Sequence, residues 1–94
     1  MALTFEWDAR KARSNLRKHG VSFVEAATVF ADPLTVTIYD PDHSSAREER
    51  FITLGHSVRR RAVVVVHCDR GDSIRIVSAR LATRGERKQY EERR

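Results

Sequence analysis

Cysteine and long hydrophobic runs are nearly absent from this sequence. Cys68 has no second cysteine with which to form an internal disulfide, which favours a reducing, cytoplasmic setting. The longest apolar stretch, Ala62–Val66, is far shorter than the roughly 18 residues of a membrane helix, and its polar flanks suit a buried strand. Residues 1–8 lack a basic region followed by an apolar run, so we expect no signal peptide and no membrane association.

Lysine and arginine are missing from the segment 21–46, which has four acidic residues and therefore a charge of −4. Residues 1–20 carry +3 and residues 47–94 carry +6, so the positive charge is concentrated outside that segment. Such an uneven basic surface favours an anionic partner, with RNA or DNA first, although a solvated surface has the same composition.

The hydrophobic content of 40% is typical of a globular chain, and the length predicts a single domain over residues 1–94. Alternating or continuous apolar residues predict strands over Leu3–Trp7, Leu34–Tyr39, Glu48–Leu54, Arg61–Asp69 and Ser73–Arg80. Helical spacing predicts helices between Asp8 and Gly20, between Ser22 and Asp32, and from Thr83 to about Glu92. The order β-α-α-β-β-β-β-α predicts an α+β fold, an antiparallel sheet with two N-terminal helices on one face and a C-terminal helix.

Two segments have the sequence of a capping box. In Ser22–Glu25 and again in Thr83–Glu86, a hydroxyl residue precedes a glutamate by three positions. The hydroxyl can accept from the backbone amide of the glutamate, whose side chain can reach back to the first residue.

The hairpin near the end of the chain is the most informative stretch. If Arg70 and Gly71 form a two-residue turn, Asp69 pairs with Asp72 and Arg61 lies opposite Arg80. Two facing arginines suit a phosphate between them, because a guanidinium group matches the phosphate oxygens. A slip of one residue would move Arg80 to the other face of the sheet, and arginines at strand ends also serve as solvated or ion-paired groups.

The four histidines show no metal-ligand spacing with one another or with Cys68, so we expect neither a metal nor a cofactor. His67 and Cys68 are adjacent in a strand and should point to opposite faces, with Cys68 as a small core residue. His43 lies in a polar loop, where it could act on a substrate, but a surface role is the simpler interpretation.

A longer series of motifs resembles the BrnT toxin family over nearly the whole chain. The series consists of Phe5-Glu6-Trp7-Asp8, Lys11-Ala12, Asn15, Lys18-His19-Gly20-Val21-Ser22-Phe23, Glu25-Ala26, Val29-Phe30, Asp32-Pro33, Asp42-His43-Ser44, Glu48-Glu49-Arg50-Phe51, Gly55, Ser57, Arg61, Ile74-Arg75-Ile76-Val77-Ser78-Ala79-Arg80, Ala82-Thr83, Glu86-Arg87 and Tyr90-Glu91. One departure is Arg60, which stands where the family often has glycine. Either Arg60 or Arg61 could therefore take the role of the family's arginine, and the spacing favours Arg61.

The resemblance implies a RelE-like fold and a metal-independent ribonuclease that blocks translation. It also implies a BrnA-like antitoxin with a ribbon-helix-helix DNA-binding domain, which neutralises the toxin. Two toxins and two antitoxins would form a 2:2 heterotetramer around a toxin homodimer. Operator DNA would be contacted only through the antitoxin complex.

The resemblance also implies roles for individual residues. Arg61 matches the arginine that opens the central strand, Arg80 that of the Ser-Ala-Arg segment, and Tyr90 the tyrosine of the last helix. We expect these three to be catalytic, with Arg61 and Arg80 on the phosphate and Tyr90 orienting the substrate or handling a proton. The residues expected to bind RNA or phosphate are Arg75, Arg60, Arg84, Arg87, Lys18 and His19.

Two alternatives remain open from the sequence. The chain could bind nucleic acid without cutting it, or it could be a decayed toxin that only binds the antitoxin. Charge and fold class fit all three interpretations, and RNA cleavage separates them.

Overall fold

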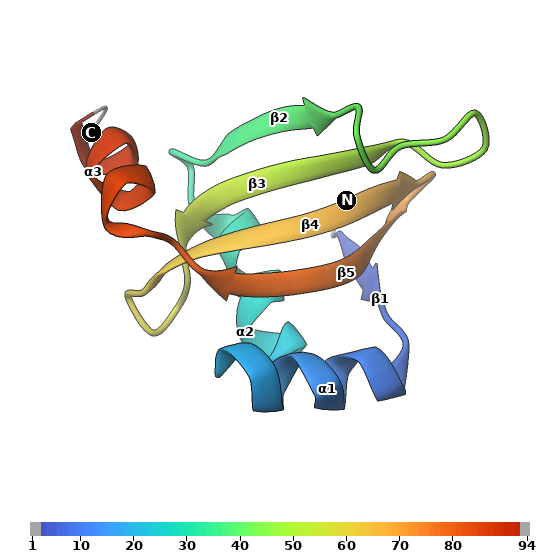
Figure 1. Ribbon diagram of the computed structural model, residues 1–94, viewed down its shortest axis with the longest axis horizontal. Helices are drawn as coiled ribbons and strands as arrows, with labels where there is room; N and C mark the ends of the chain where they lie inside the picture. Colours follow the sequence, from blue (N-terminus) through green and yellow to red (C-terminus); the bar gives the residue numbers. More distant parts are fainter. Residues whose placement is uncertain (1–2, 93–94) are drawn as a thin grey trace.

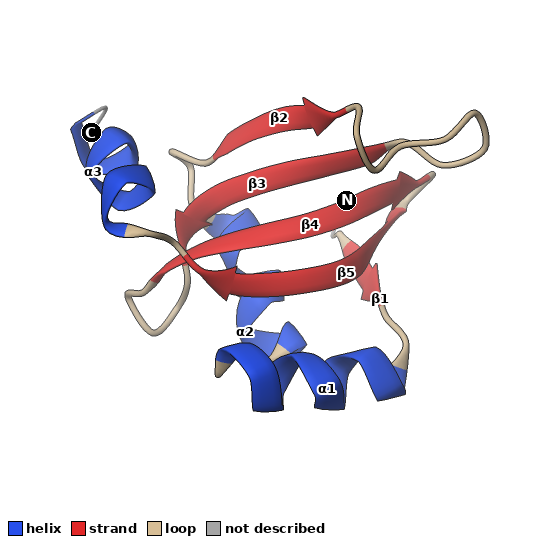
Figure 2. Ribbon diagram, in the orientation of Figure 1, coloured by secondary structure: helices blue, strands red, loops and turns tan. Residues whose placement is uncertain are grey.

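The computed structural model describes residues 3–92 (Figures 1 and 2). In chain order the elements are β1 (Thr4–Glu6), α1 (Ala9–His19), α2 (Phe23–Thr28), the short 3-10 helix η1 (Val29–Ala31), β2 (Val36–Asp40), β3 (Arg50–His56), β4 (Ala62–Arg70), β5 (Ser73–Leu81) and α3 (Arg84–Glu92). The predicted order of helices and strands is therefore confirmed, with η1 as a continuation of α2.

The five strands form one sheet in the order β1-β5-β4-β3-β2. Strands β2 to β5 pair antiparallel, as predicted (Figure 1). Strand β1, however, runs parallel to β5, with Phe5 opposite Ile74. The purely antiparallel prediction is wrong at this edge. The rule that short turns make antiparallel pairs covers β2 to β5 only, because two helices separate β1 from the rest of the sheet.

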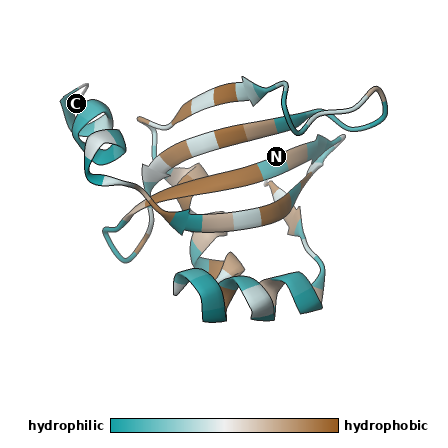
Figure 3. Ribbon diagram, in the orientation of Figure 1, coloured by the Kyte–Doolittle hydropathy of each residue, from teal (hydrophilic) through white to brown (hydrophobic). Residues whose placement is uncertain are grey.

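The helices α1 and α2 cover one face of the sheet and enclose the core (Figure 2). The fully buried members of this core are Val21, Phe23, Ala26, Val29, Val63, Val65, Ile76 and Ala79. Strand β4 is apolar along most of its length (Figure 3), because Val63 and Val65 face these helices while Val64 lies on the opposite face, near α3.

The helix ends follow the predicted signals. The Asp8 carboxylate accepts from the Lys11 amide at 3.0 Å, and Gly20 ends α1 in the left-handed conformation, with φ of 70°. Ser22 accepts from the Glu25 amide at 3.0 Å, and Thr83 accepts from the Glu86 amide at 3.2 Å.

The register of the last hairpin differs from the prediction. Arg70 pairs with Ser73 across a Gly71-Asp72 turn, and Gly71 takes a positive φ of 59° at the first turn position. An irregularity between Val66 and His67 shifts the pairing further, so that Arg80 lies opposite Val64. The predicted pairing of Arg61 with Arg80 is therefore wrong. The turn begins one residue later than expected, because glycine occupies its first position and not its second.

The side chain of His67 is buried on the helix-covered face. Its Nε2 lies 2.7 Å from the Thr53 hydroxyl, its Nδ1 lies 3.2 Å from Asp69, and its ring contacts Phe30. Burial lowers the pKa of His67, and Asp69 partly opposes this shift. Cys68 is also buried, as predicted for a small core residue. It follows His67 directly in β4, so its side chain lies on the opposite face of the sheet, in the row of Arg50 and Arg75.

Asn15 links α1 to the sheet through a buried amide. Its Nδ2 donates to the carbonyls of Val21 at 3.0 Å and Ala79 at 2.8 Å, and its Oδ1 accepts from the Ala79 amide at 3.1 Å. The helix is thereby joined to β5 by a side chain that is only 7% exposed. Within residues 3–92, no helix is long and apolar enough to cross a membrane.

We predict that Asn15→Ala lowers the free energy of unfolding by about 3 kcal/mol, because it leaves the buried Ala79 amide and two carbonyls without this partner. Urea denaturation followed by circular dichroism measures the change. Ser14→Ala, on the exposed side of the same helix, is the control. Equal stabilities of the two variants would contradict the prediction.

Candidate functional site

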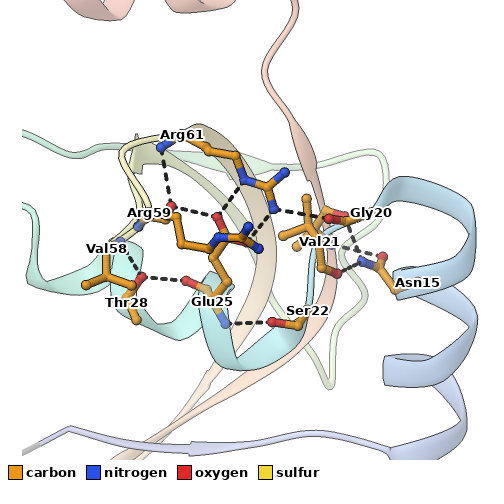
Figure 4. Close-up of polar contacts among 11 residues, drawn as sticks. Asn15, Gly20, Val21, Ser22, Glu25, Thr28, Val58, Arg59 and Arg61 are labelled. Atoms are coloured by element: carbon orange, nitrogen blue, oxygen red, sulfur yellow. Dashed lines mark hydrogen bonds and ion pairs between the residues drawn. The ribbon is translucent and has the colours of Figure 1, made fainter.

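The structure places Arg61 in the loop between β3 and β4, against α2 (Figure 4). Its Nε donates to Glu25 Oε2 at 2.9 Å, its Nη2 donates to Glu25 Oε1, and the same Nη2 donates to the Gly20 carbonyl at 3.1 Å. Arg61 therefore holds the loop against the ends of two helices. Its guanidinium group is already engaged by a carboxylate.

Glu25 is the centre of this arrangement and is only 4% exposed. The Ser57 hydroxyl donates to its Oε2 at 2.7 Å, and Arg59 Nη1 lies 3.8 Å from its Oε1. The hydrogen bond from Arg61 is the main cause that lowers the pKa of Glu25, against the opposing effect of burial. The prediction that the Glu25 side chain returns to the Ser22 amide is wrong, because the carboxylate binds Arg61 and Ser57.

Arg60 lies at the tip of the same loop with a positive φ of 63°. Glycine adopts this conformation at low cost because it has no Cβ, which explains why many members of the family have glycine at this position. The Arg60 side chain is exposed. It adds a cation beside Arg59, which is also exposed.

Arg80 lies at the end of β5, on the face of the sheet opposite α1 and α2. Its Nη1 and Nη2 donate to the two carboxylate oxygens of Glu86, at 2.8 and 3.0 Å, in a bidentate pair. Chiefly through the bond from Arg80, the pKa of Glu86 falls to about 2. Glu86 also accepts from the Thr83 amide at 2.8 Å, which completes the second predicted capping box.

Tyr90 is the buried anchor of α3 and is 1% exposed. Its hydroxyl donates to Asp32, whose Oδ2 also accepts from the His56 amide at 2.8 Å, and its ring packs against the His56 ring with 4.9 Å between centroids. Tyr90 thus fixes α3 to the sheet. The structure does not bring Arg61, Arg80 and Tyr90 together around one open groove, because Arg61 binds Glu25, Arg80 binds Glu86 and Tyr90 binds Asp32.

The other predicted RNA-binding residues are distributed over three places. Arg84 and Arg87 lie on the exposed side of α3, where they line a shallow basic pocket with Lys88, Glu91 and Glu92. Lys18 and His19 end α1. Arg75 lies on β5, one strand away from Cys68 and far along the sheet from Arg80.

The open face of the sheet contains a groove beside α3. Its lining residues are Val36, Ile38, Ile52, Leu54, Val64, Glu86, Gln89 and Tyr90. The groove is mostly apolar, and Arg80 borders it through its bond to Glu86. The open face agrees with the expectation that the two N-terminal helices cover one face of the sheet only.

A second polar cluster, which sequence reasoning did not select, lies at the other end of the open face. His43 Nδ1 is 2.8 Å from Asp40 Oδ2, where the His43 side chain is 67% exposed and that of Asp40 only 9%. Beside this pair, Glu48 binds Arg50 at 3.2 Å and Arg70 at 3.4 Å. The spacing of three between Asp40 and His43 was the signal in the sequence that could have revealed the pair.

Among the side chains of residues 3–92, no three of His, Cys, Asp or Glu are grouped so that they could hold a metal ion. The polar side chains near α3 form an arginine–carboxylate pair. Those at the other end of the open face form an arginine–carboxylate pair and a histidine–carboxylate pair. Such groups can bind phosphate, stabilise negative charge and move protons.

The arrangement of sheet and helices resembles that of a bacterial toxin of known structure. The 1.1 Å crystal structure of the Brucella abortus ribonuclease toxin BrnT matches this chain with a TM-score of 0.63. The match covers 88% of this chain and all of the other at 20% sequence identity, so the likeness shows the fold. No curated protein matches the sequence.

The family is shown by the sequence itself. The family model described as "Ribonuclease toxin, BrnT, of type II toxin-antitoxin system" matches residues 7–86. The chain therefore belongs to the BrnT family, as the motifs predicted.

We predict that Arg61→Ala lowers the free energy of unfolding by about 3 kcal/mol, because the buried Glu25 carboxylate loses its main partner. Thermal and urea unfolding measure the change. The matched control is Arg60→Ala, which removes the same charge one residue earlier and should change stability by less than about 0.5 kcal/mol. If the two variants were equally stable, Arg61 would not be the anchor of this loop.

The Arg80–Glu86 pair predicts a specific dependence of stability on pH. Because the pKa of Glu86 falls from 4.5 to about 2 on folding, its contribution is complete above pH 4.5 and is lost as the pH falls towards 2. The difference in unfolding free energy between wild type and Glu86→Gln should therefore shrink over that interval. Glu49→Gln, which removes an exposed carboxylate, should show a small difference throughout. A Glu86→Gln difference that did not change with pH would contradict the assignment.

Proposed function

We propose that this chain is a metal-independent endoribonuclease that cuts RNA and thereby inhibits translation. The observation that carries the proposal is the match of the BrnT family model to residues 7–86. The fold, which resembles that of the Brucella ribonuclease toxin, supports it.

The residue that best fits contact with the reacting phosphate is Arg80. Its side chain is 43% exposed on the open face of the sheet, and the bond to Glu86 fixes the direction of its guanidinium group. A phosphate could compete for this guanidinium, which matches phosphate oxygens as well as it matches a carboxylate. Arg84 and Arg87 lie on the helix that follows and would bind the neighbouring phosphates.

Arg61 and Tyr90 fit positioning roles in this proposal. Arg61 orders the loop that presents Arg59 and Arg60, and Tyr90 orders the helix that presents Arg84 and Arg87. Arg75, Lys18 and His19 would contact the RNA away from the reacting phosphate. Arg61 and Tyr90 would thus affect RNA binding indirectly, by holding the loop and the helix that present the other cations.

The partner in this proposal is an antitoxin of the same type II system, with a ribbon-helix-helix DNA-binding domain. Its binding over the basic residues of α3 would exclude RNA. A 2:2 complex of toxin and antitoxin would repress the shared promoter, with the DNA contacted by the antitoxin. The separate motifs quoted above support this part of the proposal through the family resemblance.

One observation favours a second function, in which the chain binds nucleic acid or antitoxin without cleavage. Both arginines expected on the phosphate are already paired with carboxylates, Arg61 with Glu25 and Arg80 with Glu86. A decayed toxin would keep such pairs for stability alone. The two functions differ in whether the folded wild-type protein cuts RNA.

We predict that Arg80→Ala reduces the RNA cleavage rate by about 100-fold, because it removes a donor to the transition state. Glu86→Gln should keep most of the activity, because Arg80 retains its charge. Purified protein and a labelled RNA in EDTA give the rates, and growth after induced expression with primer extension gives the cellular effect. Arg13→Ala, on the exposed side of α1, is the control.

Intact RNA with folded wild-type protein would overturn the ribonuclease and favour the binding function. Equal losses in Arg80→Ala and Glu86→Gln would assign the pair a structural role. A requirement for a divalent ion would contradict the metal-independent mechanism.

A further inference from the structure

We propose that the RNA backbone continues from Arg80 around the end of the sheet to a second phosphate-binding site, centred on Arg60. This inference rests on the proposed ribonuclease function and adds the path of the substrate beyond the reacting phosphate. The site lies where the β3–β4 loop, residues 57–61, meets the C-terminal end of α1 (Figure 1). Its ligand is the phosphodiester backbone of single-stranded RNA.

Arg60 has a backbone conformation that is unfavourable for any residue with a side chain. Within residues 3–92 it is the only residue other than glycine with a positive φ, which is 63°. The turn is closed by the Arg60 amide, which donates to the Ser57 carbonyl at 2.8 Å. The Arg60 side chain is exposed and makes no hydrogen bond or ion pair with another of the residues 3–92. Since no internal contact of this side chain offsets the strain, a ligand outside the chain explains the arginine better.

The other cations of the site come from the same loop and from α1. The Arg59 side chain is 68% exposed, and its Nη1 lies 3.8 Å from Glu25 Oε1, which already accepts from Arg61. Arg17 and Lys18 are exposed in the last turn of α1, a helix without an acidic residue. Cations in the last turn also interact favourably with the helix dipole, but that effect does not account for the arginines of the loop.

Arg61 joins these two groups of cations. Its Nη2 donates at 3.1 Å to the Gly20 carbonyl at the end of α1, and its Nε donates to Glu25 at 2.9 Å (Figure 4). The loop is therefore fixed against the end of the helix, and the cations of both elements lie at one junction. A guanidinium group can bind two phosphate oxygens at once, so adjacent arginines in a fixed loop suit the phosphates of an RNA chain.

The junction lies at the same end of the sheet as Arg80. The Ala82 amide, just after β5, donates at 2.9 Å to the carbonyl of Ala62, the first residue after the loop. Arg80 lies opposite Val64, two residues further along β4. In Figure 1 the β3–β4 loop, the end of β5 and α3 lie together on the left. An RNA bound at Arg80 on the open face can therefore pass around this end of the sheet to the side covered by α1.

Arg60→Gly tests the site, because it should weaken RNA binding without destabilising the fold. Glycine adopts this conformation at low cost, so the unfolding midpoint should equal or exceed that of wild type. The affinity for RNA should fall about fourfold at about 0.15 M salt, because each phosphate contact changes log K by about 0.7 for a tenfold change in salt. Fluorescence anisotropy of a labelled 2′-O-methyl RNA, in which the 2′ oxygen is blocked against attack on phosphorus, measures the affinity.

Two other substitutions separate the charge of Arg60 from its backbone conformation. Arg60→Lys keeps the charge, so it should retain most of the affinity for the same RNA. Arg60→Ala keeps the unfavourable φ and removes the charge. It should therefore bind RNA as weakly as Arg60→Gly, with no rise in the unfolding midpoint.

Two double variants, which remove equal charge from opposite ends of α1, test the contribution of the helix. Arg17→Ala with Lys18→Ala should reduce the slope of log K against log salt by about 1.4, because two phosphate contacts are lost. Arg10→Ala with Lys11→Ala removes the same charge about 10 Å further from the junction and should leave the slope close to that of wild type. Equal reductions in the two variants would show a diffuse attraction and would overturn the site.

The site and the ribonuclease function fail in different ways. If wild type cuts unmodified RNA, while Arg60→Gly and Arg60→Ala bind the methylated RNA with wild-type affinity and salt slope, Arg60 is not on the path and the function stands. A loss of affinity in Arg60→Gly together with a lowered unfolding midpoint would also overturn the inference. If the folded wild type leaves unmodified RNA intact but the variants show the expected losses of binding, the proposed function fails and the phosphate site stands.

Discussion

The buried carboxylate of Glu25 is the constraint on which the arrangement of the helices and the β3–β4 loop depends. A charged group that is 4% exposed needs ionic and hydrogen-bonding partners, and Arg61 and Ser57 supply them from the loop before β4. Arg61 also binds the Gly20 carbonyl. The end of α1, the body of α2 and the start of the central strand are thereby joined at one point. Arg61, which the family resemblance marks as catalytic, organises this joint.

Most elements of the fold could be predicted because their signals are local. A few neighbouring residues are enough to predict the helix caps at Asp8, Ser22 and Thr83 and the helix end at Gly20. The alternation that predicts a strand extends over five to nine residues. The parallel pairing of β1 with β5 and the irregular register of the last hairpin were not predictable in this way. They depend on where distant strands meet and on one extra residue in a strand, which periodicity does not encode.

The candidate site was harder to predict than the fold, because its contacts join residues far apart in the chain. Glu25 and Arg61 are 36 positions apart, and Asp32 and Tyr90 are 58 apart, so neither pair has a spacing that marks it. Asp40 and His43 are only three apart and were visible in principle. A surface role was the simpler interpretation of His43, because the sequence does not show that Asp40 is buried. Burial of one partner and exposure of the other give this pair its chemical interest.

The attachment of α3 has a consequence for the motions of the molecule. Tyr90 is the only buried residue of the segment Arg84–Glu92, so little apolar surface holds this helix to the sheet. Its docking energy is accordingly a small part of the global stability, and we expect the helix to open locally while the core beneath α1 and α2 stays folded. Each opening would uncover the apolar groove and move Arg84 and Arg87 together. The basic residues of α3 would then move as one unit, and a partner that binds either state more tightly would shift its population.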